Sequence, residues 1–348
     1  MQLSFRPLLL ELRHPFRLAI GSRTHTQVVL TEIKWRGLVG YGEAAMPPYY
    51  GENHETAAAF LNRAAVPLAQ YATFSELNDD AIAEIMAQID GLAPGNHAAK
   101  AAVDIALHDL WGKMAEQPLW QLWDLPLENM PLSSFTLGID TPAVLRDKMR
   151  ESADFQIIKI KLGSENDREI IQTIRQITDK PIYADANQGW KNKEQALELA
   201  HWLAEQNVLL IEQPFAKDDL DSSAWLSERS PLPILADESF QRLPDLDRVL
   251  DSFHGVNIKL MKCTGLSEAR RIARNVREKG KPYMVGCMTE TSCGILAAAL
   301  LCPESRFADI DGCWLIRNNP FEMPELKWGR IQLGNRAGLG LLPNVGEV

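Results

Sequence analysis

The chain has 348 residues, 46% of them hydrophobic and 24% charged, which is ordinary for a soluble globular protein. Its formal net charge of −10 argues against a nucleic-acid or anionic-membrane partner. The longest apolar run, residues 295–302, is too short to span a bilayer, and residues 1–20 contain no secretory apolar segment. The odd number of cysteines, without a C-x-x-C pair, favours reduced thiols, so we expect a cytoplasmic protein.

The first 120 residues predict an α+β unit with antiparallel strands. Residues 27–34 alternate as a strand does, and a turn at 35–37 leads into a second strand at 38–43, which is the pattern of a hairpin. The prolines, tyrosines and glycine of 44–53 predict an exposed loop. Helical periodicity follows in three segments: residues 55–71, 79–89 and 96–114.

Short apolar runs then recur along the chain, and five of them end on a charge. The five closing residues are Lys161, Asp185, Glu212, Asp237 and Lys259. Their spacings of 22 to 27 residues each hold one strand, one helix and two loops, which is a βα unit. Three further strands are predicted at residues 132–137, 282–286 and 307–311.

The repeats predict an α/β fold, a modified TIM barrel of the form (β/α)7β. We assign residues 123–317 to the barrel and residues 1–122 to an α+β capping domain, because the composition changes near 117–131. No eighth helix follows the last strand, and we expect residues 318–348 to return to the capping domain.

The order of the five charges predicts a metal site. A single charge at the end of an apolar run commonly marks only where the chain returns to water, but the carboxyl ends of barrel strands meet at one mouth. There Asp185, Glu212 and Asp237 would repel one another unless a cation or a proton lies between them. Oxygen ligands without Cys or His favour Mg²⁺, with Mn²⁺ as a substitute.

The two lysines predict proton transfer at a carbon atom. Lys161 and Lys259 close strands four steps apart in a barrel of eight, so they would face each other across the mouth. Two bases on opposite sides of an α-carbon can remove a proton from one face and return it to the other. Such a base needs a pKa well below its usual value of about 10.4, and a second ammonium at Lys159 on the same strand face would lower it. The competing interpretation is a pair of surface lysines.

Six motifs carry a resemblance to a known family. They are Lys159-Ile160-Lys161, Asp185-Ala186-Asn187-Gln188-Gly189-Trp190, Ile211-Glu212-Gln213-Pro214, Ala236-Asp237-Glu238-Ser239, Asn257-Ile258-Lys259 and Met288-Thr289-Glu290-Thr291. With these motifs the chain resembles the enolase superfamily, muconate-lactonising subgroup, and within it the dipeptide epimerases.

The resemblance implies an isomerase that inverts the α-carbon of the C-terminal residue of Ala-X dipeptides. In such enzymes a two-base 1,1-proton transfer passes through an enediolate with the help of one Mg²⁺ per subunit. Asp185, Glu212 and Asp237 would bind the metal, and Lys161 and Lys259 would be the acid/base catalysts. The resemblance further implies that Lys159 touches the metal-bound carboxylate and that loops near residues 16–26 and 45–55 close the site. We expect a homo-oligomer.

Further residues are expected to bind the dipeptide. Asp309 and Asp311 share a strand face and resemble the Asp-x-Asp with which dipeptide epimerases hold the substrate ammonium, the alternative being a bridge to Arg306 or Arg317. Four residues match positions that line the pocket of the family: Thr136, Cys287, Met288 and Thr289.

The second residue of the dipeptide depends on Arg23. Relatives that act on Ala-Glu can use an arginine of the first capping loop, and here Gly21 stands at that place, with Arg23 two residues later. If Arg23 does not reach the site, nothing neutralises an acidic side chain, and on this ground we predict a small or apolar second residue, as in Ala-Ala. The alternatives are an Ala-Glu epimerase of peptidoglycan peptide recycling, a lyase of the o-succinylbenzoate synthase or muconate cycloisomerase type, and a metal-binding barrel without turnover.

Overall fold

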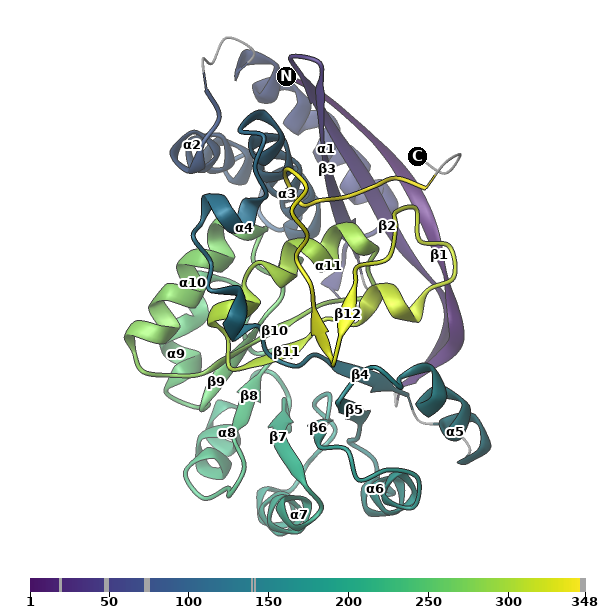
Figure 1. Ribbon diagram of the computed structural model, residues 1–348. Helices are drawn as coiled ribbons and strands as arrows, with labels where there is room; N and C mark the ends of the chain where they lie inside the picture. Colours follow the sequence, from purple (N-terminus) through teal and green to yellow (C-terminus); the bar gives the residue numbers. More distant parts are fainter. Residues whose placement is uncertain (19–20, 47–49, 72–75, 139, 141, 345–348) are drawn as a thin grey trace.

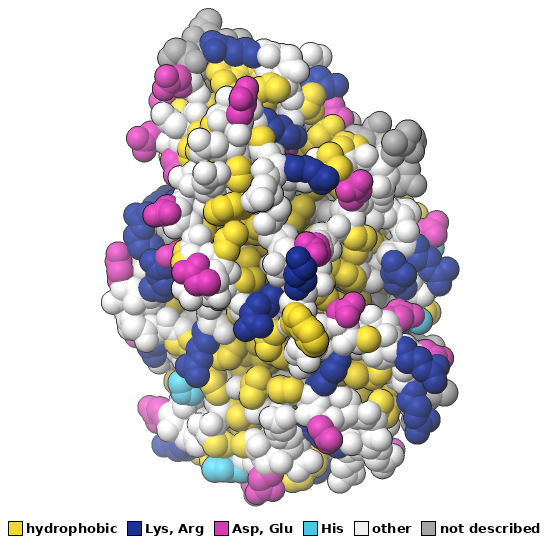
Figure 2. Space-filling view, in the orientation of Figure 1, with side chains coloured by type: hydrophobic (Ala, Val, Ile, Leu, Met, Phe, Trp, Pro, Cys, Tyr) yellow, Lys and Arg dark blue, Asp and Glu magenta, His cyan; other side chains and the backbone are white. Residues whose placement is uncertain are grey.

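The structure, a computed structural model, describes residues 1–18, 21–46, 50–71, 76–138, 140 and 142–344 (Figure 1). An antiparallel sheet with three helices lies beside a barrel of parallel strands, as the sequence predicted. None of the helices in these ranges combines the length and the apolar character that a membrane span needs. Acidic and basic side chains are interspersed over the face shown in Figure 2, so neither charge is concentrated at one place there.

The capping domain is built on the sheet β1 (Gln2–Leu18), β2 (Gly21–Trp35) and β3 (Leu38–Ala45), paired in that order. The predicted hairpin is confirmed, with Trp35 opposite Leu38. Arg36 and Gly37 have φ angles of 50° and 80°, and two residues with positive φ make the tight turn that suits the twist of a hairpin.

Three helices cover this sheet: α1 (His54–Gln70), α2 (Asp79–Asp90) and α3 (His97–Met114). All three agree with the predicted segments to within about one residue at each end. The alanine-rich helix α3 lies directly on β3, because a Cβ atom on Gly42 would be only 1.9 Å from the carbonyl oxygen of Ala102. Small residues on both elements therefore allow their backbones to meet, which explains why α3 carries so many alanines.

Eight parallel strands form the barrel, in the order of the chain. They are β4 (Ser134–Leu137), β5 (Ile157–Lys161), β6 (Ile182–Asp185), β7 (Val208–Glu212), β8 (Ile234–Ala236), β9 (Gly255–Ile258), β10 (Tyr283–Gly286) and β11 (Phe307–Asp309). A bridge between Ser133 and Ala308 joins the first strand to the last. All eight strands lie where the sequence placed them.

Helices surround the barrel on the outside (Figure 1). They are α5 (Pro142–Glu151), α6 (Asp167–Arg175), α7 (Lys193–Glu205), α8 (Leu220–Ser227), α9 (Leu246–Leu250), α10 (Leu266–Glu278) and α11 (Ser292–Ala299). The short α4 (Leu119–Leu122) lies between capping domain and barrel, and the division at residue 122 stays a prediction.

After β11 the chain makes the 3-10 turn Gly312–Leu315 and the small hairpin β12 (Leu326–Lys327) and β13 (Arg330–Ile331). This tail touches both parts of the molecule. Its Arg317 donates a backbone hydrogen bond to Glu11 of β1, and Ser133 beside β4 donates one to Gly329.

The barrel interior is layered along each strand. One end is filled by a separate apolar cluster: Ile157, Tyr183, Leu210, Leu235, Met284 and Phe307. Each of these residues precedes an inward-facing residue by two positions, because successive side chains of a strand alternate between its faces. Ile157 is followed by Lys159, Tyr183 by Asp185, and β7, β8 and β11 repeat this pattern, whereas on β10 Gly286 stands two positions after Met284. The apolar layer thus closes the barrel beneath a polar layer at the carboxyl ends of the strands.

Ion pairs join the capping domain to the barrel. Asp79 of α2 accepts hydrogen bonds of 2.8 and 2.9 Å from Arg270 of α10, and Asp90 accepts two of 3.0 Å from Arg242. Burial works against the charge of Asp79, but hydrogen bonds from His108 and Arg270 lower its pKa to about 2. The ionised form of Asp79 therefore stabilises the docked domains.

We expect Asp79→Asn to lower the free energy of unfolding by about 1 kcal/mol at pH 7, because Asp79 is partly exposed and solvent screens the pair. Since the folded-state pKa lies below the ordinary value of 3.8, this stabilisation is present above pH 4 and is lost as the pH falls through about 2. Urea unfolding at pH 7, 4 and 3 measures it, with Asp80→Asn on the same helix turn as the control. An equal effect of both substitutions at pH 7 would contradict the role of the ion pair.

Candidate active site

A cavity of about 420 Å³ lies at the carboxyl ends of the barrel strands. It is lined by eleven of the residues predicted from the sequence and by others that were not. The predicted ones are Arg23, Thr136, Lys159, Lys161, Asp237, Lys259, Cys287, Met288, Thr289, Asp309 and Asp311. The remaining two predicted residues, Asp185 and Glu212, are fully buried and contact Lys159.

The three predicted metal-binding carboxylates stand on neighbouring strands. Asp185 is in register with Glu212 across β6 and β7, and Asp237 directly follows β8. Asp185 and Glu212 have no exposed surface, and Asp237 is buried as well. Burial raises the pKa of Glu212, and strand order and the period of two along each strand place these carboxyl groups near enough for Asp185 and Asp237 to raise it further.

Lysines neutralise these carboxylates. The Nζ atom of Lys159 lies 2.6 Å from Glu212 and 3.0 Å from Asp185, while Lys161 lies 2.6 Å from Asp185 and Lys259 2.7 Å from Asp237. Because charges in such a buried place are costly unless they are paired, each lysine depends on its carboxylate and each carboxylate on its lysine.

The pKa values reflect this competition between like and unlike charges. Burial and the neighbouring Asp185 raise the pKa of Glu212 to about 7. For Asp185 burial acts in the same direction, but Lys159 and Lys161 outweigh it and lower its pKa to about 2. Burial together with Asp237 raises the pKa of Glu238 to about 7. The cluster holds more carboxyl groups than its lysines can neutralise.

The donor set fits a divalent cation. Carboxylate oxygens are the ligands that Mg²⁺ prefers, and three buried acceptor atoms around them have no hydrogen-bond partner in the part of the chain that the structure describes: Asn187 Oδ1, Glu238 Oε2 and Asn257 Oδ1. Within the described ranges no three Asp, Glu, His or Cys side chains converge on one point as metal ligands. Instead their oxygens face lysines, so a cation at Asp185, Glu212 and Asp237 would compete with those ammonium groups.

The two candidate acid/base lysines come from strands four steps apart, Lys161 from β5 and Lys259 from the residue after β9. The expected lowering of a lysine pKa is not found at Lys259. Burial lowers its pKa, but Asp237 and Glu212 outweigh burial and raise it well above the usual value. Lys159 is shifted upward in the same way by Asp185, Asp309 and Glu212. The sequence argument concerned Lys161 beside Lys159 and a divalent cation, and it did not include the carboxylates that bind Lys259 and Lys159 here.

Asp309 at the end of β11 and Asp311 two residues later both line the cavity. Asp309 accepts hydrogen bonds of 2.6 Å from Lys159 and 2.7 Å from the hydroxyl of Ser134, and Asp311 accepts one of 2.6 Å from the backbone of Thr136. Burial and Asp309 raise the pKa of Asp311 to about 7. The alternative partners bind elsewhere: Arg317 donates to the carbonyl of Arg13, and Arg306 stacks on Phe307.

Arg23 reaches the cavity. The prediction of a small or apolar second residue assumed that it does not, so that assumption is corrected. Its Nη2 atom donates a hydrogen bond of 3.1 Å to the hydroxyl of Thr289, and both residues line the cavity. The side chains of residues 16–22, which include the Gly21 position, lie outside the described residues. A one-dimensional alignment of the loop could not show that Arg23 crosses to the end of β10.

Cys287 is a lining residue whose thiol stays protonated. Burial, with Glu290 next in effect, raises its pKa well above the usual value. Without a depressed pKa it is a poor nucleophile, in agreement with the expected pocket-lining role.

Sequence reasoning missed several residues of the site. Tyr50, Lys217 and Gln241 line the cavity from loops, where no periodic pattern marks them. Lys262 is the largest omission, because its buried Nζ atom lies 2.6 Å from Asp237 Oδ1 and 3.0 Å from the carbonyl of Asn257. The signal was present in the sequence as a fourth lysine, three residues after Lys259.

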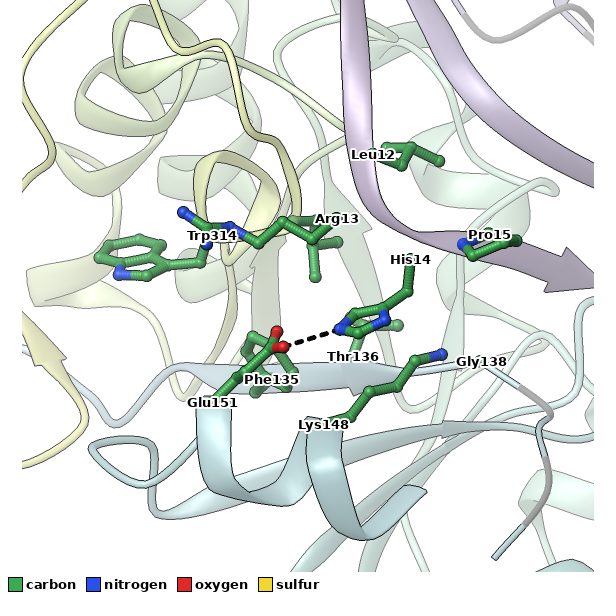
Figure 3. A pocket seen from close by; sticks show the side chains of 11 residues that line it. Leu12, Arg13, His14, Pro15, Phe135, Thr136, Gly138, Lys148, Glu151 and Trp314 are labelled. Atoms are coloured by element: carbon green, nitrogen blue, oxygen red, sulfur yellow. Dashed lines mark hydrogen bonds and ion pairs between the residues drawn. The ribbon is translucent and has the colours of Figure 1, made fainter. Parts of the chain in front are cut away.

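A smaller pocket of about 20 Å³ adjoins the cavity and shares Thr136 and Leu315 with it. Figure 3 shows His14 of β1 facing Glu151 of α5 across this pocket, with 2.8 Å between Nε2 and Oε1. A pocket of this size holds little more than a water molecule. The contact instead fastens the capping domain to the barrel beside the mouth.

The family of the chain follows from this architecture and from comparison with known proteins. Residues 144–347 match the model of enolase C-terminal domain-like proteins, and residues 5–123 match the N-terminal domain of mandelate racemase and muconate lactonizing enzyme. The chain therefore belongs to the enolase superfamily, and the relatives below are epimerases, a class of isomerases.

Individual relatives agree along almost the whole chain. An L-Ala-D/L-Glu epimerase of Bacteroides thetaiotaomicron is 48% identical over 343 residues, 98% of this chain and 88% of that protein. Among solved structures, the dipeptide epimerase of Enterococcus faecalis complexed with Mg and L-Leu-L-Tyr has a TM-score of 0.88 at 32% identity, covering 98% of both chains. The substrate-liganded L-Ala-D/L-Glu epimerase of Bacillus subtilis also has a TM-score of 0.88, at 28% identity and with 99% and 98% covered.

We expect Lys262→Met to lower the free energy of unfolding by about 3 kcal/mol, because it leaves the buried Asp237 with one ammonium in place of two. The matched control is Lys279→Met, which breaks an exposed pair with Asp247 and should change stability by less than about 1 kcal/mol. Urea unfolding at pH 7 compares the two. Similar losses in both variants would show that Lys262 is not a buried counter-charge.

Proposed function

We propose that this protein is a dipeptide epimerase that inverts the α-carbon of the C-terminal residue of Ala-Glu and similar dipeptides with an acidic second residue. The observation that carries the choice of substrate is Arg23, whose guanidinium lies at the cavity and meets Thr289 there. A guanidinium at the cavity pairs well with a side-chain carboxylate. The relative from Bacteroides, an L-Ala-D/L-Glu epimerase by name, supports this choice.

The other end of the dipeptide carries an ammonium group. Asp309 and Asp311 present carboxyl oxygens to the same cavity, and an ammonium in a buried place requires such acceptors. Lys159 is already bound to Asp309, so the incoming ammonium would mainly meet Asp311. The site thereby offers carboxyl groups for the ammonium of the dipeptide and a guanidinium for the acidic side chain of its second residue.

Proton transfer is assigned to Lys161 and Lys259. The neutral form of one Nζ atom takes the α-proton, and the ammonium form of the other returns a proton to the opposite face, which inverts the centre. Their strands stand on opposite sides of the barrel, as this chemistry requires. Burial lowers the pKa of Lys259, but Asp237 and Glu212 outweigh burial and raise it, so the neutral form of Lys259 requires that these carboxylates bind the cation instead.

Asp185, Glu212 and Asp237 would hold one Mg²⁺ per subunit, with Mn²⁺ as a substitute. When bound, the cation neutralises the negative charge that builds up on the substrate carboxylate as the α-proton leaves. The ammonium of Lys159 contributes positive charge on the same side, because it bridges Asp185 and Glu212. Arg23 and Tyr50, both from the capping domain, would limit the access of water.

Hydrogen exchange tests the reaction. In D₂O with Mg²⁺, we expect the protein to place deuterium on the α-carbon of the C-terminal residue of Ala-Glu and to invert it, as followed by mass spectrometry and chiral chromatography. Lys161→Ala and Lys259→Ala should each lower inversion by at least about a hundredfold, because each removes one of two proton-transfer groups. Each variant should still exchange the enantiomer whose α-proton faces the remaining lysine.

The exposed Lys34→Ala is the control for this experiment, and an excess of EDTA should abolish the activity of all variants. Inversion retained in either lysine variant would contradict the two-base scheme. A failure of wild-type protein to label any dipeptide would instead favour a lyase on this scaffold.

Substitution of Arg23 tests the substrate class. We expect Arg23→Met to raise the KM for Ala-Glu by about tenfold or more, since one partner of a charge pair is lost, and to leave Ala-Met nearly unchanged. Steady-state rates with both dipeptides measure the difference, and the exposed Arg248→Met serves as the control. If the wild-type protein prefers Ala-Ala or Ala-Met to Ala-Glu, the original prediction of a small or apolar second residue is right and the acidic one is wrong.

A further inference from the structure

Glu290 is a buried carboxyl group that adjoins the cavity but does not line it. Its side chain is 1% exposed, and its Oε1 atom accepts a hydrogen bond of 2.7 Å from the backbone N–H of Met288. A Cβ atom on Gly294 would be 2.1 Å from its Oε2 atom, so the carboxyl group also lies against the first turn of α11. Glu290 thus ties together a turn of residues 287–289 whose three side chains all face the cavity.

A second carboxyl group meets the same segment from the capping domain. Glu43 of β3 has no exposed surface and accepts hydrogen bonds from the backbone N–H groups of Thr291 (2.9 Å) and Gly294 (3.0 Å) and from the Thr291 hydroxyl. Burial, and after it the proximity of Glu43, raises the pKa of Glu290 to about 8. Glu290 is therefore a neutral carboxylic acid at pH 7.

The turn set by Glu290 holds the residue on which substrate choice depends. Thr289, between Met288 and Glu290, accepts the hydrogen bond of Arg23. A fixed backbone at Met288 therefore fixes the Thr289 hydroxyl, and the hydroxyl in turn fixes the guanidinium. A guanidinium that is already held loses less entropy when it pairs with a carboxylate.

We propose that Glu290 is a positioning residue for recognition of the second residue of the dipeptide, acting through the backbone of Met288 and through Thr289 on Arg23. This inference rests on the proposed preference for an acidic second residue and extends it to the residue that maintains the subsite. An acid with a purely structural role would affect acidic and neutral substrates alike.

The test compares Ala-Glu with Ala-Gln, which differ only in the charge of the second side chain. Glu290→Gln keeps an oxygen that can accept the hydrogen bond from Met288, and it is uncharged like the neutral acid. We therefore expect kcat/KM for both substrates to stay within about threefold of the wild-type values. Glu290→Ala removes the acceptor, and we expect kcat/KM for Ala-Glu to fall by about tenfold or more, mainly through KM, with Ala-Gln changing less than about threefold.

The control is Asp109→Ala, which removes a fully buried carboxyl that accepts the backbone N–H groups of Tyr41 and Leu339 and does not line the cavity. It should lower stability and leave the ratio of the two substrates unchanged. Equal losses on both substrates in Glu290→Ala, or a loss in Glu290→Gln as large as in Glu290→Ala, would overturn the proposal. Wild-type protein without any preference for Ala-Glu would instead overturn the proposed function.

A second measurement needs only wild type and Glu290→Gln, and so serves if the alanine variant does not fold. Among the described residues, the titratable groups that face Glu290 are Glu43 of β3, Lys259 after β9, Cys287 of its own turn and Cys293 of α11. As the pH rises through about 8, Glu290 ionises beside Glu43, and the repulsion should loosen the turn. We expect the Ala-Glu to Ala-Gln ratio of kcat/KM to decline between pH 7 and 9 in wild type and to stay constant in Glu290→Gln. Parallel profiles would overturn the proposal.

Discussion

The buried charge cluster at the barrel mouth is the constraint on which the rest of the site depends. Six carboxyl groups at or beside the cavity face four lysines: Asp185, Glu212, Asp237, Glu238, Asp309 and Asp311 against Lys159, Lys161, Lys259 and Lys262. Isolated charges in such a place would cost far more than the fold can supply, so every lysine here binds a carboxylate. Burial and neighbouring carboxylates raise the pKa of Glu212, Glu238 and Asp311 to about 7, so a divalent cation bound here would favour their ionised forms.

The layered barrel explains how a stable fold carries such a cluster. On β5, β6, β7, β8 and β11 an apolar residue of the interior lies two positions before a charged one, so the part that stabilises the barrel and the part that performs chemistry occupy separate levels. The capping domain then adds what the strands cannot provide. Arg23 and Tyr50 reach the cavity, while Glu43 enters the barrel side of the interface and shares a turn with Glu290. Substrate choice thus depends on how two domains dock, and the ion pairs of Asp79 and Asp90 maintain that docking.

Most of the fold and of the charged layer could be predicted from residue order. Strands in a barrel follow one another along the chain, and a residue that closes an apolar run lies at a known level of the barrel. For this reason Lys161, Asp185, Glu212, Asp237 and Lys259 could be placed together without coordinates. The acid/base state of those lysines could not be predicted, because it depends on distances of 2.6 to 3.0 Å between groups on different strands. The spacing of residues along the chain does not specify distances between side chains on different strands.

By itself, then, the sequence determined the barrel with its capping domain, the positions of the mouth residues and the family to which they point. The physical reason is that strand period and repeat length are local properties of the chain. Only the tertiary structure decided that Arg23 reaches Thr289, that Lys262 binds Asp237 and that Glu43 lies close to Glu290. These contacts join loops and domains that are far apart in the chain, and their geometry arises from packing and from the pairing of buried charges, which no local pattern encodes.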